Sequence, residues 1–463
     1  MIGVGDLVQH PRLGSGVVLE IRHMGYDARV NFFGHPLWVP CKVLTVIASG
    51  AVRTTGAPAG GPASAQRPGR PVPTALVRPQ SIDFRSRQIL ESLRIGIVPD
   101  FALRDWTVGR EEEFRSVLEW LADPTEASAI LLGTYGSGKT HMLRYLEQQA
   151  LEQGFAVAMV RVDPGEENSS FPYRFYGHVM KALRVPRTDG LDDAVSVFQD
   201  AAMTGRSVTL AGHPFFGRFA RAIQQGVDRR NDWQAFLGDR AESHYFPNLH
   251  GMTTAANVTC NMLTAFSSFL AQEGGAKGLV LLVDEVETSE VRRHAYHWKR
   301  TLNFLRGLTL ASNDDPILSE PVARAVAGYR VGANSGLVYC GHHPGLSYSF
   351  GSPSHLKVML ALTECRVTGR LREWRNGQPV LALSDIRRSD LYRLFGKIAG
   401  TYCALHDMRF PSHLEQWVFT QLLQEAFASR SVRGFAKATV EVLDFLRHYP
   451  NEPLERFARY RTF

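Results

Sequence analysis

Hydrophobic and polar positions follow three different patterns along the chain. Near the N-terminus, short β-branched and aromatic runs at residues 17–21, 28–32 and 37–39 are separated by glycine-containing turns, which predicts a small all-β module. In the middle, short continuous apolar runs alternate with segments of helical period, which predicts a parallel α/β sheet flanked by helices. Beyond about residue 384 the strand signals fade, and helical periodicity predicts an all-α C-terminal region.

These patterns divide the chain into four segments. Residues 1–48 are expected to close as a small SH3-like β-barrel. Residues 49–80 are rich in glycine, alanine and proline and are expected to form a flexible linker. Residues 81–383 form the predicted α/β core, in which residues from about 171 to 270 are a largely helical insertion. Residues 384–463 form the predicted all-α C-terminal region, which resembles the helical lid of AAA+ ATPases.

A glycine-rich motif follows the first apolar run of the core, residues 128–132. It fits the phosphate-binding pattern G-x-x-x-x-G-K-[ST] and leads into a helical pattern that begins at His141. Its glycines allow successive backbone N–H groups to point at one anion, the lysine reaches β- and γ-phosphates, and the last hydroxyl holds Mg²⁺. The alternative, a strand-to-helix turn without a ligand, does not explain why both flanks fit. The motif consists of Gly133, Thr134, Tyr135, Gly136, Ser137, Gly138, Lys139 and Thr140.

A second motif ends the apolar run at residues 278–283. Asp284 and Glu285 follow directly, at the carboxyl end of the predicted strand, where α/β folds place their ligands. Asp284 is expected to hold Mg²⁺ and Glu285 to orient and deprotonate the attacking water. An ordinary strand that ends in solvated acids is the alternative. Together with the phosphate-binding motif, this pair predicts an ATPase that uses ATP and Mg²⁺.

Composition changes this picture only slightly. The 463 residues carry 52 Lys and Arg against 45 Asp and Glu, a net charge of +7 that favours polyanionic partners mildly. Five cysteines without a C-x-x-C pair indicate a reducing compartment and neither a disulfide framework nor a zinc site. Since no signal sequence and no apolar run long enough to cross a bilayer is visible, we expect a cytoplasmic protein without membrane contact.

Two stretches near the N-terminus carry a first resemblance. Residues 4–10 (VGDLVQH) followed by residues 13–18 (LGSGVV) resemble the Tudor-like module of CarD-type transcription regulators and UvrD-type helicases. The resemblance implies contacts with RNA polymerase or other proteins. For any single aromatic residue, filling the barrel is the competing interpretation. The candidate contact residues are Arg12, Tyr26, Phe33 and Trp38.

Residues from about 85 to 450 resemble the ATP-binding protein of BREX-type phage-defence systems, in the origin-recognition-like branch of AAA+ P-loop ATPases. The motifs that carry this resemblance are residues 109–111 (GRE), 133–140 and 281–285, followed by the strand-then-lid order downstream. The resemblance implies that Val108, Gly109 and Arg110 pack beside the adenine.

The resemblance also implies three further site residues. His342, at the end of a short strand predicted within residues 336–343, is the candidate γ-phosphate sensor, with His343 second. Arg433, at the start of the last lid helix, is the candidate sensor arginine, with Arg430 as the fallback. Arg306, on a basic helix predicted over residues 291–308, is the candidate arginine finger into a neighbouring subunit. A solvated basic face is the commoner explanation for such a helix.

Two functions of different classes remain open at this stage. The first is a DNA-associated motor or loader, homo-oligomeric on ATP, that acts on duplex DNA without sequence specificity for a partner helicase or methyltransferase. The second is a nucleotide-dependent switch or scaffold, in which the N-terminal barrel recruits RNA polymerase or another protein.

Overall fold

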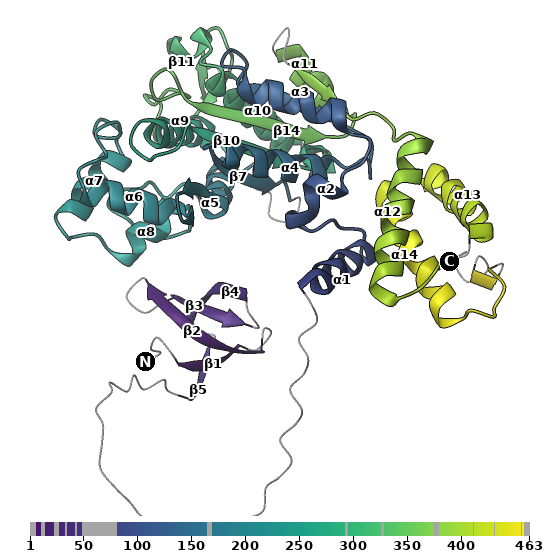
Figure 1. Ribbon diagram of the computed structural model, residues 1–463. Coiled ribbons are helices and arrows are strands. Elements are labelled where there is room, and N and C mark those ends of the chain that lie inside the picture. The colour runs from purple at the N-terminus through teal and green to yellow at the C-terminus, as the bar shows by residue number, and fades with distance from the viewer. Residues whose placement is uncertain are drawn as a thin grey trace, which may run out of the picture. The chain divides into compact units, whose positions relative to one another are not determined.

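The computed structural model describes residues 6–10, 14–22, 27–32, 35–41, 44–48, 81–163, 169–291, 295–325, 328–374, 379–410, 412–429, 431–454 and 456–457. The chain separates into two compact units, residues 1–77 and 78–463, and each is described by itself (Figure 1). The predicted linker, residues 49–80, lies outside the described residues. Among the described helices, none has the length and apolar character needed to cross a membrane.

The first unit is a five-stranded antiparallel sheet. Its strands are β1 (Leu7–His10), β2 (Gly14–Arg22), β3 (Asp27–Phe32), β4 (His35–Pro40) and β5 (Thr45–Ala48), in the order β4-β3-β2-β1-β5. Alternate positions of these strands point inward, and a small core forms from Val8, Val18, Ala28, Val30 and Val39. The predicted strands are confirmed, whereas closure into an SH3-like barrel stays a prediction. Arg12, Tyr26 and Phe33 lie outside the described residues, as does the side chain of Trp38.

The second unit is built on a parallel five-stranded sheet. The strands are β6 (Ser128–Leu132), β7 (Ala156–Arg161), β10 (Leu279–Asp284), β14 (Leu356–Leu362) and β15 (Val380–Ala382), in the order β15-β6-β14-β10-β7. Each strand is a nearly unbroken apolar run because helices cover both faces of the sheet. The predicted α/β class with a helix-flanked parallel sheet is confirmed.

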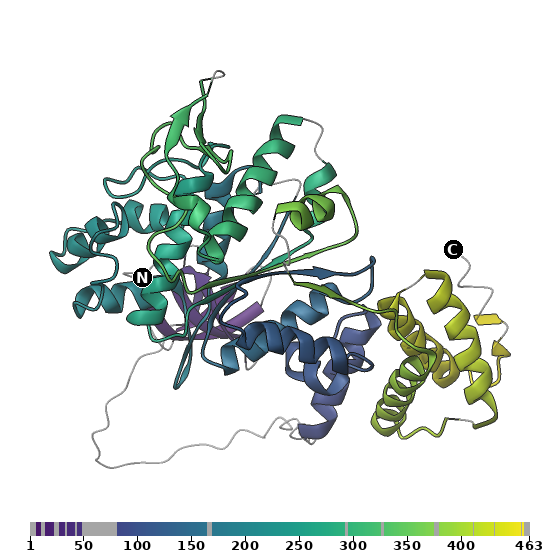
Figure 2. The ribbon, with the colours of Figure 1, turned by 90° about the horizontal axis from the view of Figure 1, so that it is seen from above.

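Helices α3 (Glu111–Ala122) and α4 (Lys139–Glu152) cover one face of the sheet, and α5 (Pro172–Ala182), α9 (Ala256–Gln272) and α10 (Ala295–Ser312) cover the other (Figure 2). On the first face, Trp120 and Leu143 pack against Leu131 and Leu282. On the second face, a larger core continues from the sheet through α9 and α10. The parallel strands therefore carry their carboxyl ends to a single edge, which is where the two predicted motifs meet.

The helical insertion expected over residues 171–270 is resolved into two parts. Helices α5 and α9 belong to the layer that covers the sheet, whereas α6 (Ala194–Met203), α7 (Phe216–Gln224) and α8 (Arg230–Phe236) extend it sideways (Figure 1). A short hairpin, β8 (Val185–Arg187) and β9 (Gly190–Asp192), precedes α6. Aromatic packing joins the extension to the layer: the rings of Phe198 and Phe236 lie 5.0 Å apart, and both contact Phe266 on α9. The insertion therefore shares one core with the sheet.

A second, smaller sheet lies between α10 and β14. After the short helix η5 (Pro316–Ser319) come β11 (Val322–Arg324), β12 (Arg330–Gly332) and β13 (Val338–Tyr339), all antiparallel. Asn257 of α9 accepts a hydrogen bond from Cys340 N, and Asn303 of α10 accepts one from Val338 N, each at 2.8 Å. These two side chains therefore supply acceptors for backbone N–H groups at and just after β13, and they hold the small sheet against α9 and α10.

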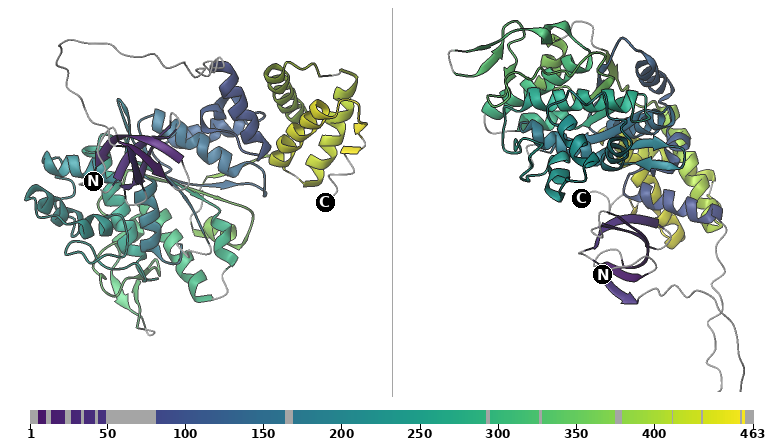
Figure 3. Two further views of the ribbon diagram at one scale, coloured as in Figure 1. Left: turned by 90° about the horizontal axis from the view of Figure 1, so that it is seen from below. Right: turned by 90° about the vertical axis from the view of Figure 1, so that its left-hand side faces the viewer.

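The C-terminal helices form a separate cluster with α1 (Ser81–Arg94), at one end of the second unit (Figure 3). They are α12 (Arg388–His406), α13 (Ser412–Ser429) and α14 (Val432–His448), and α1 packs against α12 and α14. The sequence grouped residues 81–94 with the α/β core. The apolar face of α1, with Ile89, Leu90 and Leu93, instead completes the buried core of the C-terminal helices. The remaining elements, η3 (Asp100–Ala102) and α2 (Leu103–Trp106), then lead the chain back to the sheet.

Candidate nucleotide-binding site

The phosphate-binding motif forms the turn between β6 and α4. Gly136 and Gly138 have φ angles of +78° and +102°, a conformation that favours glycine, and Gly138 is the N-cap of α4. The backbone N–H groups at the start of α4 are thereby free to bind an anion, helped by the positive end of the helix dipole. Tyr135, at the tip of the turn, is 86% exposed, so its ring contacts no core.

Lys139 folds back over this turn. Its Nζ donates to Gly133 O at 3.1 Å and to Thr134 O at 3.3 Å, and it lies 3.6 Å from Glu287 Oε1. The side chain is only 8% exposed, so the ammonium is held at the inner side of the loop, where the terminal phosphates of a nucleotide would bind. Glu287 was not recognised in the sequence, although it lies two residues beyond the acidic pair.

The two predicted motifs meet at one hydrogen bond. Thr140 Oγ1 donates to Asp284 Oδ2 at 2.7 Å, across 144 positions of sequence. Asp284 is almost fully buried, and burial raises the pKa of its carboxyl, although the hydrogen bonds from Thr140 and from Glu285 N oppose that shift. A hydroxyl and one carboxylate fit Mg²⁺, which is usually held by one or two protein oxygens together with substrate phosphates. Thr140 and Asp284 are therefore suited to hold the metal of a bound Mg–nucleotide.

Glu285 is engaged by an arginine that the sequence did not single out. Arg161, the last residue of β7, donates from Nε to Glu285 Oε2 at 2.8 Å and from Nη2 to Glu285 Oε1 at 2.6 Å. The backbone of Glu285 has a φ of +55°, which is strained for a residue with a side chain. The strained turn is held by hydrogen bonds from Val162 N to Asp284 O and from Thr288 N to Glu285 O, both 3.0 Å long. The predicted base is thus fixed in a two-point ion pair at the edge of the site.

The assignment of a sensor to His342 requires correction. The strand that precedes it, β13, pairs with β12 in the small sheet and does not enter the parallel sheet. The strand β13 is only two residues long. The position in the parallel sheet between β6 and β10 is filled instead by β14, an apolar strand of seven residues. His342 is exposed on the small sheet's side, and the ring of His343 packs against Phe215, 5.5 Å away.

Thr363 is the residue that the fold brings to the position expected of a sensor. It follows β14 directly, and Gly133 N donates to Leu362 O at 3.2 Å, so Thr363 lies beside the start of the phosphate loop. Its carbonyl accepts from Thr368 Oγ1 at 3.0 Å, which fixes the turn into α11 (Arg366–Trp374). The apolar run at residues 356–362 was the available signal, because it predicts a buried strand.

The segment at residues 108–110 lies against the phosphate loop and connects it to two other parts of the second unit. The Arg110 guanidinium is 5% exposed and donates to Ser137 O at 2.8 Å, to Ser384 O at 2.6 Å and to Glu113 Oε1 at 2.8 Å. It therefore connects the loop, the helix α3 and the start of the lid. Gly109 has a φ of +71°, and a Cβ there would lie 2.4 Å from Asp390 Cγ of α12.

His141, the third residue of α4, is partly buried beside this segment. Its Nε2 lies 2.5 Å from Thr107 Oγ1, and burial lowers the pKa of the imidazole to about 4, with smaller contributions from the charges of Arg144 and Arg110. The ring is neutral at physiological pH. Neutral imidazole next to residues 107–110 closes the side of the site on which an adenine is expected.

The two remaining predicted arginines do not point into the site. Arg433 Nη2 donates to Ile95 O at 3.4 Å, so its side chain lies on the end of α1. Its helix nevertheless begins at the loop, because a Cβ on Gly136 would lie 3.1 Å from Oγ of the N-cap Ser431. Arg306 Nη1 donates to Ser335 O at 2.7 Å and packs under the small sheet. Arg430 lies outside the described residues.

Comparison with known protein families supports a nucleotide site. Residues 83–195 match the family described as BREX system ATP-binding protein BrxC/D. No curated protein matches the chain. The matched region, about a quarter of the chain, contains the segment at residues 108–110, the whole phosphate loop and Arg161, and it ends before Asp284 and Glu285. Over this region the chain is similar to ATP-binding proteins of BREX systems.

Proposed function

We propose that the chain binds ATP with Mg²⁺ and hydrolyses it. The observation that carries the proposal is the 2.7 Å hydrogen bond between Thr140 and Asp284, which joins a phosphate loop to an acidic strand end at one site. Lys139 binds the β- and γ-phosphates from the inner side of the loop. Thr140 and Asp284 hold Mg²⁺, which neutralises charge that develops on the phosphates.

Hydrolysis requires a base and an oriented water. Once free of Arg161, the Glu285 carboxylate takes a proton from a water whose oxygen forms a bond to the γ-phosphorus. The bond between that phosphorus and the β–γ bridging oxygen breaks, and ADP and inorganic phosphate leave. Thr363, between the loop and the acidic strand, is placed to hydrogen-bond the γ-phosphate or the water. It takes the role that the sequence gave to His342.

We further propose that the chain is an AAA+ ATPase that acts on DNA in a phage-defence system, as an oligomeric motor or loader for a partner helicase or methyltransferase. The strand β14 between the phosphate-loop strand and the acidic strand supports the class, as does a helical lid whose last helix begins at the loop. The similarity of residues 83–195 to BREX ATP-binding proteins supports the defence role.

ATP hydrolysis with and without duplex DNA tests this function, with the wild type beside Glu285→Gln. We expect slow basal turnover that DNA stimulates and that the variant loses, while the variant still binds ATP and assembles. The amide keeps the shape of the side chain but cannot take the proton. Turnover in Glu285→Gln equal to that of the wild type would exclude Glu285 as the base, and turnover that ignores DNA would remove DNA from the proposal.

A nucleotide-dependent switch is the second candidate function. The observation that favours it is the Arg161–Glu285 ion pair, in which the predicted base accepts a hydrogen bond from arginine on each oxygen. In a switch, ATP would close the lid and the N-terminal unit would recruit a protein such as RNA polymerase. Stable ATP binding by the wild type, with neither hydrolysis nor DNA binding, would select this candidate over the motor or loader.

A further inference from the structure

One face of the small sheet carries a row of hydrogen-bond donors. Arg324 of β11 lies directly opposite Arg330 of β12, and Arg330 lies directly opposite Tyr339 of β13. Directly opposite residues of antiparallel strands share a face, with Cβ atoms about 5 Å apart. The row is therefore two guanidinium groups followed by a phenol. It lies away from the nucleotide site, on a sheet that the proposed ATPase chemistry does not use.

The two arginines lack a carboxylate to neutralise them. Both are exposed, and no ion pair joins either of them to an acid in the described parts of the chain. Like charges placed directly opposite one another destabilise a sheet. Glu320, which precedes β11 and lines the pocket beside this row, accepts from Ser335 Oγ, Ser335 N and Asn334 N, so its carboxylate is engaged in holding the β12–β13 turn. The arginine pair is thus arranged for an anion from outside the chain.

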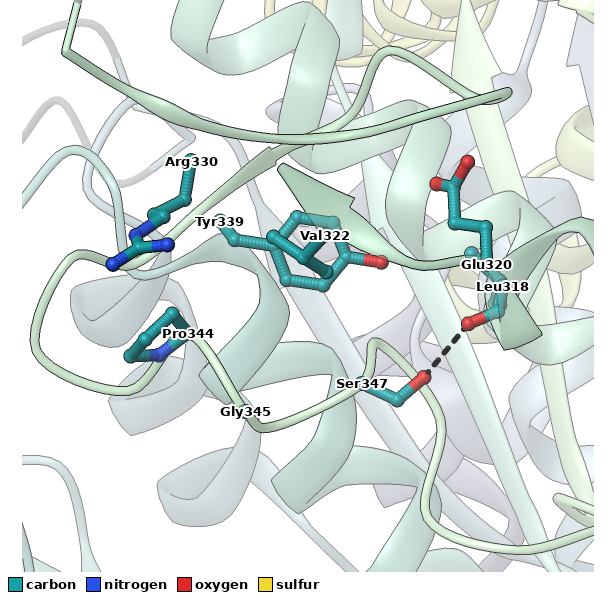
Figure 4. A pocket seen from close by; sticks show the side chains of 8 residues that line it. All are labelled: Leu318, Glu320, Val322, Arg330, Tyr339, Pro344, Gly345 and Ser347. Atoms are coloured by element: carbon teal, nitrogen blue, oxygen red, sulfur yellow. Dashed lines mark hydrogen bonds between the residues drawn. The ribbon is translucent and has the colours of Figure 1, made fainter. Parts of the chain in front are cut away.

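Tyr339 extends the row into a cavity. Leu318, Val322, Arg330 and Pro344 help to line a pocket of about 390 Å³ on this face, and Figure 4 shows the Tyr339 ring between Arg330 at one end and Glu320 and Ser347 at the other. The side chain is 2% exposed, and its hydroxyl has no hydrogen-bond partner among the described residues. Burial, with a smaller contribution from Glu320, raises the pKa of Tyr339 to about 12, so the phenol keeps its proton. A buried donor without a partner is costly unless an acceptor reaches it.

The sheet that presents this row is held rigidly. The guanidinium of Arg300, on α10, lies 4.6 Å from the Tyr329 ring centre and 5.1 Å from that of Tyr296. This stack fastens the β11–β12 connection to the helix. On the other side, Asn303 donates to Val338 O at 3.2 Å and accepts from Val338 N, which fastens β13. Because these contacts hold the backbone of the sheet, only the arginine side chains have to be ordered when a ligand binds.

We propose that this row binds one strand of DNA through an unpaired nucleotide, with phosphate oxygens on Arg324 and Arg330 and an acceptor of the sugar or base on Tyr339. The proposal rests on the DNA-directed part of the proposed function and names its contact surface. Adjacent guanidinium groups without acids match successive phosphates, and Arg binds phosphate in a two-point geometry. A concave pocket beside them fits a nucleotide that is not stacked within a duplex.

The test measures binding of the full-length protein to fluorescein-labelled oligothymidylate by anisotropy, between about 50 and 200 mM KCl. Arg324→Ala/Arg330→Ala should lower the slope of log K against log salt by about 1.4, because each phosphate contact on a single strand contributes about 0.7. Tyr339→Phe should keep the wild-type slope and weaken binding about fivefold, the value of one hydrogen bond. Arg218→Ala/Arg221→Ala removes the same charge from exposed positions of α7 and serves as the matched control.

The outcomes separate the site from the function. A full wild-type slope in Arg324→Ala/Arg330→Ala, with a reduced slope in the α7 control, would overturn the site and leave the DNA-directed function standing. Wild-type affinity in Tyr339→Phe would overturn the pocket contact. Absence of salt-sensitive oligothymidylate binding by the wild type would overturn the site, and the additional absence of stimulation of turnover by duplex DNA would overturn the DNA-directed function. ATP turnover that Glu285→Gln abolishes would still support the ATPase.

Discussion

Replacement of Arg161 by alanine should raise the basal rate of ATP hydrolysis. The arginine donates two hydrogen bonds to the Glu285 carboxylate, at 2.6 and 2.8 Å. While this pair is intact, each carboxylate oxygen accepts a hydrogen bond from a cation, which makes Glu285 a weaker base toward water. Arg161→Ala removes the competing donor and leaves the Thr140–Asp284 contact and the phosphate loop unchanged. The effect should therefore appear in kcat and leave ATP affinity unaltered.

The size of the increase follows from the exposure of the pair. Arg161 is 69% exposed and Glu285 30% exposed, so solvent screens most of the attraction. Exposed ion pairs contribute about 0.2–1 kcal/mol, and the two-point geometry places this one near the upper value of about 1 kcal/mol. If loss of the ion pair lowers the activation free energy of hydrolysis by that amount, kcat rises about fivefold. For the same reason, higher salt should raise wild-type kcat at saturating ATP and leave Arg161→Ala unaffected.

Steady-state turnover at saturating Mg–ATP measures the effect. Arg206→Ala is the control, because Arg206 forms an exposed ion pair with Asp200 of α6, which belongs to the helical extension. It should leave kcat unchanged. A loss of turnover in Arg161→Ala comparable to that in Glu285→Gln would refute the reasoning, since Arg161 would then hold Glu285 in its productive position.

Three further predictions concern the site and its surroundings. Gly109→Ala should lower the free energy of unfolding by more than the roughly 1–2 kcal/mol of backbone strain, because its Cβ would also meet Asp390; Gly205→Ala, with a φ of +73° and open space around it, is the control in urea titrations. The folded-state pKa of His141, about 4, lies below its unfolded value of 6.5, so its stabilising effect is complete above pH 6.5 and is lost as pH falls toward 4. Between pH 6.5 and pH 4, the free energy of unfolding should fall by about 3 kcal/mol more in the wild type than in His141→Gln. Urea titrations at these two pH values measure the difference, and equal decreases in the two proteins would contradict a neutral His141 ring in the folded state. Thr363→Val should lower kcat about tenfold or more with unchanged binding of a fluorescent ATP analogue, as expected for a lost transition-state hydrogen bond, and unchanged kcat would exclude the hydroxyl.

The local parts of the nucleotide site could be predicted from sequence because each is coded by a few adjacent residues. The glycines of residues 133–138 specify a turn, and the apolar run before Asp284 specifies a buried strand that ends in two acids. Parallel strands carry their carboxyl ends to one edge, so the meeting of Thr140 with Asp284 follows from the fold class alone.

The remaining site residues depend on strand order, which no local pattern contains. Residues 338–339 and 356–362 are both apolar runs before polar residues, and only the sheet pairing shows that the second enters between β6 and β10. That pairing places Thr363 beside the phosphate loop, whereas His342 follows a strand of the small sheet. Arg161 is unremarkable in sequence, because its importance arises from a partner 124 positions away. The packing of α1 against the C-terminal helices could not be predicted, because an amphipathic pattern shows that one face of a helix is buried but not which element buries it.

Two contacts join the lid to the phosphate loop, and both are made by protein groups alone. Arg110 bridges Ser137 O and Ser384 O, so the loop and the first residue of the lid segment share one guanidinium. Ser431, the N-cap of α14, lies against Gly136 on the other side of the loop. Any shift of the loop on binding phosphate must therefore either move the lid or break a buried hydrogen bond to a charged group, which is worth about 1.5–3 kcal/mol. The Arg161–Glu285 ion pair lies on β7 and β10, at the opposite end of the strand order from β15, and shares none of these contacts. If the proposed function holds, movement of the lid and release of Glu285 are therefore separable, and substitutions at Arg110 and at Arg161 should change different steps of turnover.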